Sequence, residues 1–204
     1  MPVGFNLVLP PGWDKIRLQE EFLDDSILAV VDRSIRQLPD DLAKDDISKV
    51  RMELFKQLRK AARKAARANG LILYLPTERV HDTVIPASFV VTEPTPVTGD
   101  VGSGIQTDHI FAALAADNST SEAVEVDGSS GIRMERVVHP QEGSEIPFSS
   151  RRVEYVLSVP GRPLPRWLAI TFSTVGDGKP DSDYSSALVE LFDAVMMTFR
   201  WSYE

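Results

Sequence analysis

Hydrophobic and polar residues alternate in several short stretches of the chain, and this two-residue period is typical of β-strands. It is clearest over 131–138, 152–160 and 167–175, and the short stretches 3–9, 15–18, 71–75 and 87–91 are further strand candidates. The stretches 152–160 and 167–175 form the clearest pair, because the segment 160–165 between them contains three prolines and a glycine. Such a segment can hardly be anything but a loop. We therefore predict a β-hairpin over 152–175, with Val153, Tyr155 and Leu157 on one face of its first strand.

Three other segments have a three- to four-residue period, which is typical of an amphipathic helix. They are 23–38, 46–68 and 184–199, and Asp183 is expected to cap the last one. Asn69-Gly70 is a strong stop signal for the second helix, since glycine adopts the left-handed capping conformation without a Cβ clash. Thr107 is expected to cap a further short helix over 107–116.

Strands arranged as hairpins, with long helices before and after them, favour an α+β fold over repeated βαβ units. We expect an antiparallel β-sheet flanked by helices. The polar loop over 92–104 could mark a boundary, but neither half of the chain holds enough strands to stand alone. The sequence therefore favours one domain over residues 1–204.

Composition narrows the class of protein. With 43% hydrophobic and 25% charged residues, the 204-residue chain is typical of a globular protein. The absence of cysteine excludes disulfides and thiolate metal sites, and a net charge of −8 argues against binding nucleic acid over the whole surface. The first residues carry no basic group, and no apolar stretch reaches about 18 residues. We expect neither a signal peptide nor a membrane span, and a cytoplasmic location.

Five segments carry a resemblance to a known family: 9–13 (LPPGW), 86–91 (PASFVV), 152–157 (RVEYVL), 167–174 (WLAITFST) and 191–201 (LFDAVMMTFRW). Together they resemble the PsbP-like domains of uncharacterised actinobacterial proteins, including the LpqN type. The resemblance implies an α/β/α sandwich around an antiparallel sheet, and a binding or assembly role, as in photosystem assembly, Ran binding or effector chaperoning. It supplies no catalytic residues. The chain departs from the LpqN pattern because it lacks a lipoprotein signal and a cysteine.

The residues that could carry chemistry are scattered. His81, His109 and His139 lie far apart and in no metal-binding spacing. Ser103, Asp108 and His109 lie close in sequence but lack the G-x-S-x-G spacing of a nucleophile elbow. Neighbouring residues of a helix also point about 100° apart, so Asp108 is badly placed to orient His109.

Gly99–Gly104 precedes the short helix expected at Thr107, as a phosphate-binding loop would. It has neither the Lys-Ser/Thr of a P-loop nor the G-x-G-x-x-G order, and Asp100 would repel a phosphate. A plain loop is the better interpretation. We expect no metal or organic cofactor.

The predicted helix over 46–68 is unusually basic. Residues 49–67 hold eight lysines and arginines against one acid, Glu53. At 100° per residue, all but Arg51 fall within an arc of about 140°. The residues expected on the buried side are Leu54, Leu58, Ala61 and Ala65. The candidate partner-binding residues are Lys56, Arg59, Lys60, Arg63, Lys64 and Arg67.

Two interpretations of this basic stripe stay open: a solvated face balanced by the protein's own acidic loops, or a dock for an acidic partner protein. Anionic membrane or nucleic acid comes third, because large apolar anchors and interleaved aromatics are missing from the charged face. The leading hypothesis is a non-enzymatic binding or accessory module. The alternative is an enzyme whose small-molecule pocket is built from residues scattered in the sequence, and a deep cavity with convergent polar groups would favour it.

Overall fold

The computed structural model describes residues 1–38, 43–79, 84–94, 120–140, 147–161 and 166–203. The chain forms two compact units. One consists of residues 9–92, and the other of residues 1–8 together with 93–204. The prediction of a single domain over 1–204 stays a prediction.

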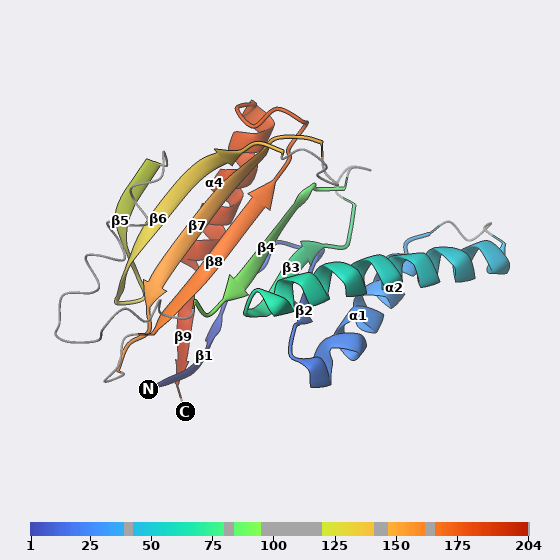
Figure 1. Cartoon of the computed structure of the whole chain (residues 1–204), viewed down its shortest axis with the longest axis horizontal. Helices are drawn as coiled ribbons and strands as arrows, with labels where there is room; N and C mark the ends of the chain where they lie inside the picture. The colour runs from blue at the N-terminus through green and yellow to red at the C-terminus, as the bar shows by residue number, and fades with distance from the viewer. Residues whose placement is uncertain (39–42, 80–83, 95–119, 141–146, 162–165, 204) are drawn as a thin grey trace. The chain divides into compact units, whose positions relative to one another are not determined.

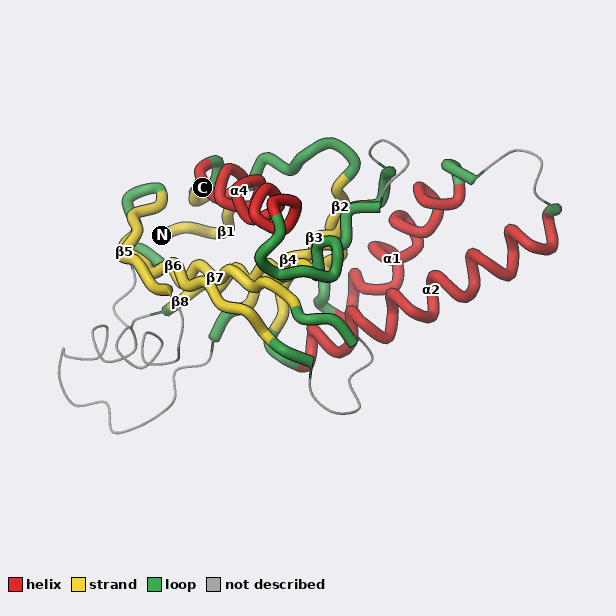
Figure 2. The backbone as a smooth tube through the Cα atoms, turned by 90° about the horizontal axis from the view of Figure 1, so that it is seen from above, coloured by secondary structure: helices red, strands yellow, loops and turns green. Residues whose placement is uncertain are grey.

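The unit of residues 9–92 is a three-stranded antiparallel sheet covered by two helices. Its elements are β2 (Trp13–Arg17), α1 (Glu20–Ile35), α2 (Lys44–Arg67), β3 (Gly70–Pro76) and β4 (Ala87–Thr92). The strand order is β2-β3-β4, and α1 and α2 lie side by side (Figures 1 and 2). The core forms where the predicted apolar face of α1 meets the sheet. Its buried residues are Ile16, Leu18, Leu23, Ile27, Val30, Val31 and Ala62.

The other unit contains a four-stranded antiparallel sheet in the order β8-β7-β6-β5. Its elements are β1 (Pro2–Asn6), β5 (Thr120–Val126), β6 (Ser129–Val138), β7 (Ser150–Ser158), β8 (Trp167–Thr174), α4 (Asp183–Met197) and β9 (Arg200–Tyr203). The first and last strands, β1 and β9, pair with each other in a separate ribbon. The two ends of the chain therefore lie close together (Figure 1).

The predicted hairpin over 152–175 is confirmed as the antiparallel pair β7–β8, in which Tyr155 lies opposite Ile170. Helix α4 packs on the face of the sheet that carries Tyr155, because the Tyr155 side chain contacts Asp193 and Phe192 of α4. Phe192 of α4 stacks on Phe172 at 4.9 Å between ring centroids and meets the edge of Tyr155 at 5.8 Å. Each such aromatic pair contributes about 0.5–1.5 kcal/mol to stability, in addition to the contribution from burying its apolar area. The predicted period of α4 thus places the right residues in the core.

The structure corrects some local predictions. Ser182, not Asp183, caps α4, because the Ser182 hydroxyl accepts a hydrogen bond from the Ser185 N–H at 3.1 Å. Asp183 lies in the first turn, where its negative charge interacts favourably with the positive end of the helix dipole. Strands β5 and β9 had no counterpart among the predicted elements. The helix expected at Thr107 lies outside the described residues.

Every described strand pair is antiparallel, and helices pack on the sheet in both units. This confirms the predicted α+β fold with an antiparallel β-sheet flanked by helices. The finer prediction of a PsbP-like α/β/α sandwich stays a prediction. Among the described helices, none is long and apolar enough to cross a membrane.

Candidate functional site

A groove of about 580 Å³ runs along the exposed side of α2. Its lining includes all six basic residues that the sequence suggested as a partner-binding stripe, together with two large apolar residues that the sequence reasoning missed. The lining residues are Met52, Phe55, Lys56, Arg59, Lys60, Arg63, Lys64 and Arg67. The apolar pair could have been found by the same helical projection, since both fall inside or beside the basic arc.

These eight residues form two parallel rows. Residues four apart are neighbours on a helix surface and together make a ridge. One ridge is Met52, Lys56, Lys60 and Lys64, and the other is Phe55, Arg59, Arg63 and Arg67. Each ridge begins with a large apolar side chain and continues with three cations. The groove is therefore apolar at the end nearer the N-terminus of α2 and cationic along the rest.

The core-facing side of α2 lies nearly opposite to the basic stripe, as predicted, and half-buried Ala65 packs on the core. Ala62 is fully buried, and half-buried Leu54 and Leu58 pack on the same core. Ala61, which was expected in the core, is exposed. In projection the residues of α2 that pack on the core are centred roughly 150° from the middle of the stripe, and Phe55 lies between the two. Phe55 is consequently shared: it packs on the core and also lines the groove.

The six predicted site residues differ in their partners. Arg59 forms an ion pair with Asp24 of α1, at 2.7 Å between Nη2 and Oδ2. Its guanidinium also lies over the Phe55 ring, 5.8 Å from the centroid. Arg59 thus ties α2 to α1 besides lining the groove.

Most of the other basic side chains form no ion pair in the described part of the chain. Across the described residues, four of them form no ion pair and no hydrogen bond through their side chains: Lys56, Arg63, Lys64 and Arg67. All four are exposed. The alternative of a solvated face balanced by acidic loops of the same chain stays a prediction.

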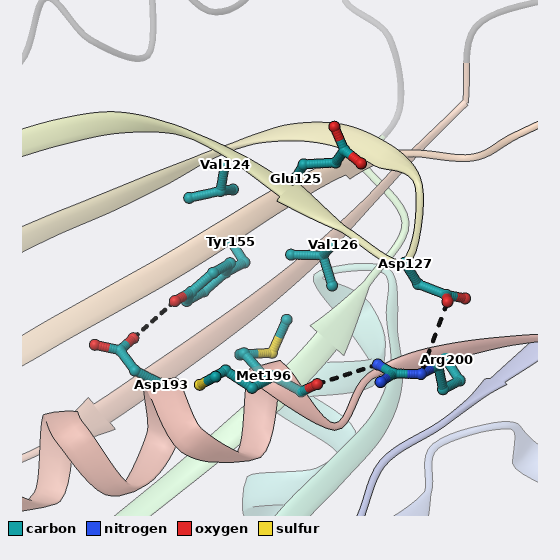
Figure 3. Close-up of a pocket in the computed structure, with 9 residues that line it drawn as sticks. Val124, Glu125, Val126, Asp127, Tyr155, Asp193, Met196 and Arg200 are labelled. Atoms are coloured by element: carbon teal, nitrogen blue, oxygen red, sulfur yellow. Dashed lines mark hydrogen bonds and ion pairs between the residues drawn. The ribbon is translucent and has the colours of Figure 1, made fainter.

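A second cavity, of about 310 Å³, lies between the β5–β6 hairpin and the end of α4 (Figure 3). Its apolar wall comes from Val124, Val126 and Met196, and the Tyr155 hydroxyl and the Asp193 carboxylate face each other at 2.9 Å. The remaining lining residues are Glu125, Asp127, Met197 and Arg200.

The wall of this α4 pocket is held by a network of charged side chains. The Arg133 guanidinium of β6 donates to both carboxylate oxygens of Asp193, at 3.0 and 2.8 Å, and to Glu135 at 2.9 Å. Glu135 also accepts from Arg151 of β7. The Arg133 side chain is only 11% exposed. Because such bidentate, charge-assisted bonds fix orientation as well as distance, they hold α4 in register on the sheet.

Tyr155 is held in its neutral form at the pocket wall. Burial raises the pKa of Tyr155, and the hydrogen bond to the Asp193 carboxylate raises it further. A neutral phenol that donates to Asp193 serves as a fixed polar group, not as a base. The pocket thus offers an apolar cavity with a small number of oriented polar atoms.

The other sequence candidates yield no site in the described part of the chain. His139 Nδ1 lies 3.0 Å from the Ser149 hydroxyl and has an exposed position. His81, the Ser103–Asp108–His109 group and Gly99–Gly104 lie outside the described residues. Within the described ranges, no three histidine or acidic side chains converge as metal ligands would. The absence of a cofactor stays a prediction.

No protein-family model matches the sequence, and no curated protein matches it either.

Proposed function

We propose that the chain is a non-enzymatic binding module that docks an acidic partner protein in the groove of α2. One observation carries this proposal: Lys56, Arg63, Lys64 and Arg67 line one groove, are exposed, and form no ion pair within the described residues. Clustered like charges repel one another, and an oppositely charged surface relieves that repulsion. The resemblance to PsbP-like domains, which implies a binding role, supports the same proposal.

A protein partner fits the groove better than nucleic acid does. The chain as a whole carries −8, so a long polyanion would meet repulsion beyond the stripe. Stacking on bases would need exposed aromatic rings, and Phe55 is half-buried under Arg59. A compact acidic surface on a protein avoids the repulsion beyond the stripe and needs no exposed aromatic ring.

Reversing three groove cations should weaken partner binding about 100-fold, mainly through a slower association rate. The variant is Lys56→Glu, Arg63→Glu, Lys64→Glu, chosen because these side chains make no native ion pair in the described residues. Crosslinking and mass spectrometry identify the partner in native cells, and titration calorimetry with both purified proteins gives the affinity at several salt concentrations. Affinity should fall with salt, since the Debye length shrinks from about 8 Å at physiological ionic strength.

The matched control reverses three exposed basic residues outside the groove: Lys15→Glu, Lys44→Glu, Lys179→Glu. It changes the net charge by the same amount, and it should leave affinity within about twofold of the native protein. Both variants should melt near the native temperature, because exposed charges contribute only ~0–1 kcal/mol each. Equal binding by the folded groove variant and the native protein would refute the proposal.

The α4 pocket favours a second candidate function, small-molecule binding at a site built from scattered residues. Its volume lies at the lower end of the range for ligand sites, about 300–1,000 Å³, and its walls come from residues 124–127, Tyr155 and 193–200.

Val126→Trp should fill the pocket and abolish any ligand binding there, because Val126 is one of the apolar wall residues. A fragment library monitored by backbone amide chemical shifts should perturb residues 124–127 in the native chain and leave them unperturbed in this variant. The groove variant serves as the control and should respond like the native protein. If no fragment perturbs these residues, the second candidate is wrong.

A further inference from the structure

The two ridges of α2 have the geometry that receives another helix. Ridges of residues four apart on one helix pack between the corresponding ridges of a second helix, with the axes crossing at about −50°. The ridge of Met52 and the ridge of Phe55 run parallel and border one groove. Because a helix presents its own four-residue ridge as a continuous row of side chains, such a row fits the space between them.

The side chains of the two ridges determine which residues a helix must carry to fit between them. We infer that the groove receives an α-helix of the partner protein that carries one large apolar side chain, followed at four-residue steps by three Asp or Glu residues. The apolar side chain lies between Met52 and Phe55, and the acids lie between the lysine row and the arginine row. This inference rests on the proposed function, since it names the part of the partner that docks on α2.

The apolar end of the groove determines the register in which the partner helix binds. Met52 is 69% exposed, so its side chain offers apolar surface to a partner. Burying a methionine side chain contributes more to binding than an exposed ion pair does. The apolar contact therefore sets which register of the acidic row binds best, and the six cations speed the encounter.

The length of the groove fits a short helix. From Met52 to Arg67 the axis of α2 rises about 22 Å at 1.5 Å per residue. An apolar residue and three acids at four-residue steps extend over about 18 Å of a second helix. The row of four side chains is thus slightly shorter than the groove that receives it.

Designed peptides test this inference without knowledge of the partner. The row peptide is an alanine-based helix of about 20 residues with one leucine and three glutamates at successive four-residue steps. The off-row peptide has the same composition, with the glutamates spread around the helix. We expect the row peptide to bind the native chain at least about tenfold more tightly in fluorescence anisotropy, a difference of about 1.4 kcal/mol.

A double-mutant cycle locates the apolar contact. Replacing the leucine of the row peptide by alanine should weaken binding to the native chain about tenfold. The same replacement should change binding to the Met52→Ala variant by less than about twofold, because the contact is already lost. Met52 is exposed, so this variant keeps the fold, whereas Phe55 also packs on the core.

The following results would contradict the inference. Equal binding of row and off-row peptides would show that only charge matters, and a leucine effect that persists in Met52→Ala would place the apolar contact elsewhere. Failure of the row peptide to bind at all, or tighter binding to phosphatidylserine vesicles than to the peptide, would exclude a helix as the occupant. The proposed function survives these results if charge reversal in the groove still weakens the native partner, and it fails separately if reversal has no effect.

Discussion

Replacing Arg133 by alanine should lower the free energy of unfolding by about 3 kcal/mol. The Arg133 side chain is 11% exposed and bonds both oxygens of Asp193 and one oxygen of Glu135. Its removal leaves the Asp193 carboxylate with the Tyr155 hydroxyl as its remaining hydrogen-bond partner among the described residues of this network. Breaking a partly buried ion pair from one side is costly because the remaining charge, on the 31% exposed Asp193 side chain, stays partly desolvated. Urea unfolding followed by circular dichroism measures the loss.

Conservative variants separate charge from packing. Arg133→Met keeps the aliphatic stem and should still lose about 2 kcal/mol, whereas Arg133→Lys keeps the charge and loses the bidentate geometry, so its loss should be smaller. Adding Asp193→Asn to Arg133→Met should cost little more, because the isolated charge disappears. Strictly additive losses would contradict the coupling of Arg133 to Asp193.

The effect of Arg133→Met should also depend on pH. Burial alone would raise the pKa of Glu135, but hydrogen bonds and charge from Arg133 and Arg151 outweigh it and hold the pKa below the usual 4.5. A lowered pKa contributes stability that is present above pH 4.5 and is lost as pH falls through the lowered value. Arg133→Met removes part of this contribution, so its deficit should be larger at neutral pH than at about pH 3. A constant deficit would show that Glu135 is not part of the network.

Much of the fold follows from local patterns in the sequence. Alternation over 152–175 identified the central hairpin, because one face of β7 and β8 packs on α4 and must be apolar. The four-residue period of 184–199 identified α4 itself. Burial of α4 on one side only leaves a strong periodic signal in its sequence.

Other elements gave weaker signals. Strand β5 has mostly exposed residues, so its alternation is faint. Its turn carried a usable signal: Asp127 and Gly128 both have positive φ, as a two-residue hairpin turn requires, and Asp-Gly is a favoured pair there. Strand β9 pairs with β1 from the opposite end of the chain, and a pairing across almost the whole sequence leaves no local pattern.

The two candidate sites also differ in how far the sequence predicts them. All six predicted cations line the α2 groove, since a helix converts sequence spacing into surface position with few errors. Of the residues predicted on the buried side, Leu54, Leu58 and Ala65 pack on the core, and the prediction was wrong for Ala61, which is exposed. The α4 pocket could not be predicted, since residues 124–127, Tyr155 and 193–200 meet only through strand pairing and helix docking.

Gly131→Ala should be the most disruptive small substitution in the β5–β6–β7 region, lowering the free energy of unfolding by about 3 kcal/mol. Gly131 lies in β6 opposite Leu157 of β7. A Cβ at Gly131 would lie 2.5 Å from the Val156 carbonyl oxygen and 2.6 Å from the Leu157 Cδ2. Both neighbours belong to a strand that β6 and β8 hold from either side, so the backbone oxygen cannot move without breaking ladder hydrogen bonds.

Gly4→Ala is the matched control for this substitution. Gly4 also lies in a strand, β1, but a Cβ there would meet nothing within 4 Å, and the backbone is not in the left-handed region. Because the two variants add the same methyl group to an extended backbone, their difference reports the steric clash at Gly131. Parallel thermal melts should show Gly4→Ala within about 0.5 kcal/mol of the native protein and Gly131→Ala far below it. Similar melting of the two variants would mean that β6 and β7 are not packed as closely as 2.5 Å implies.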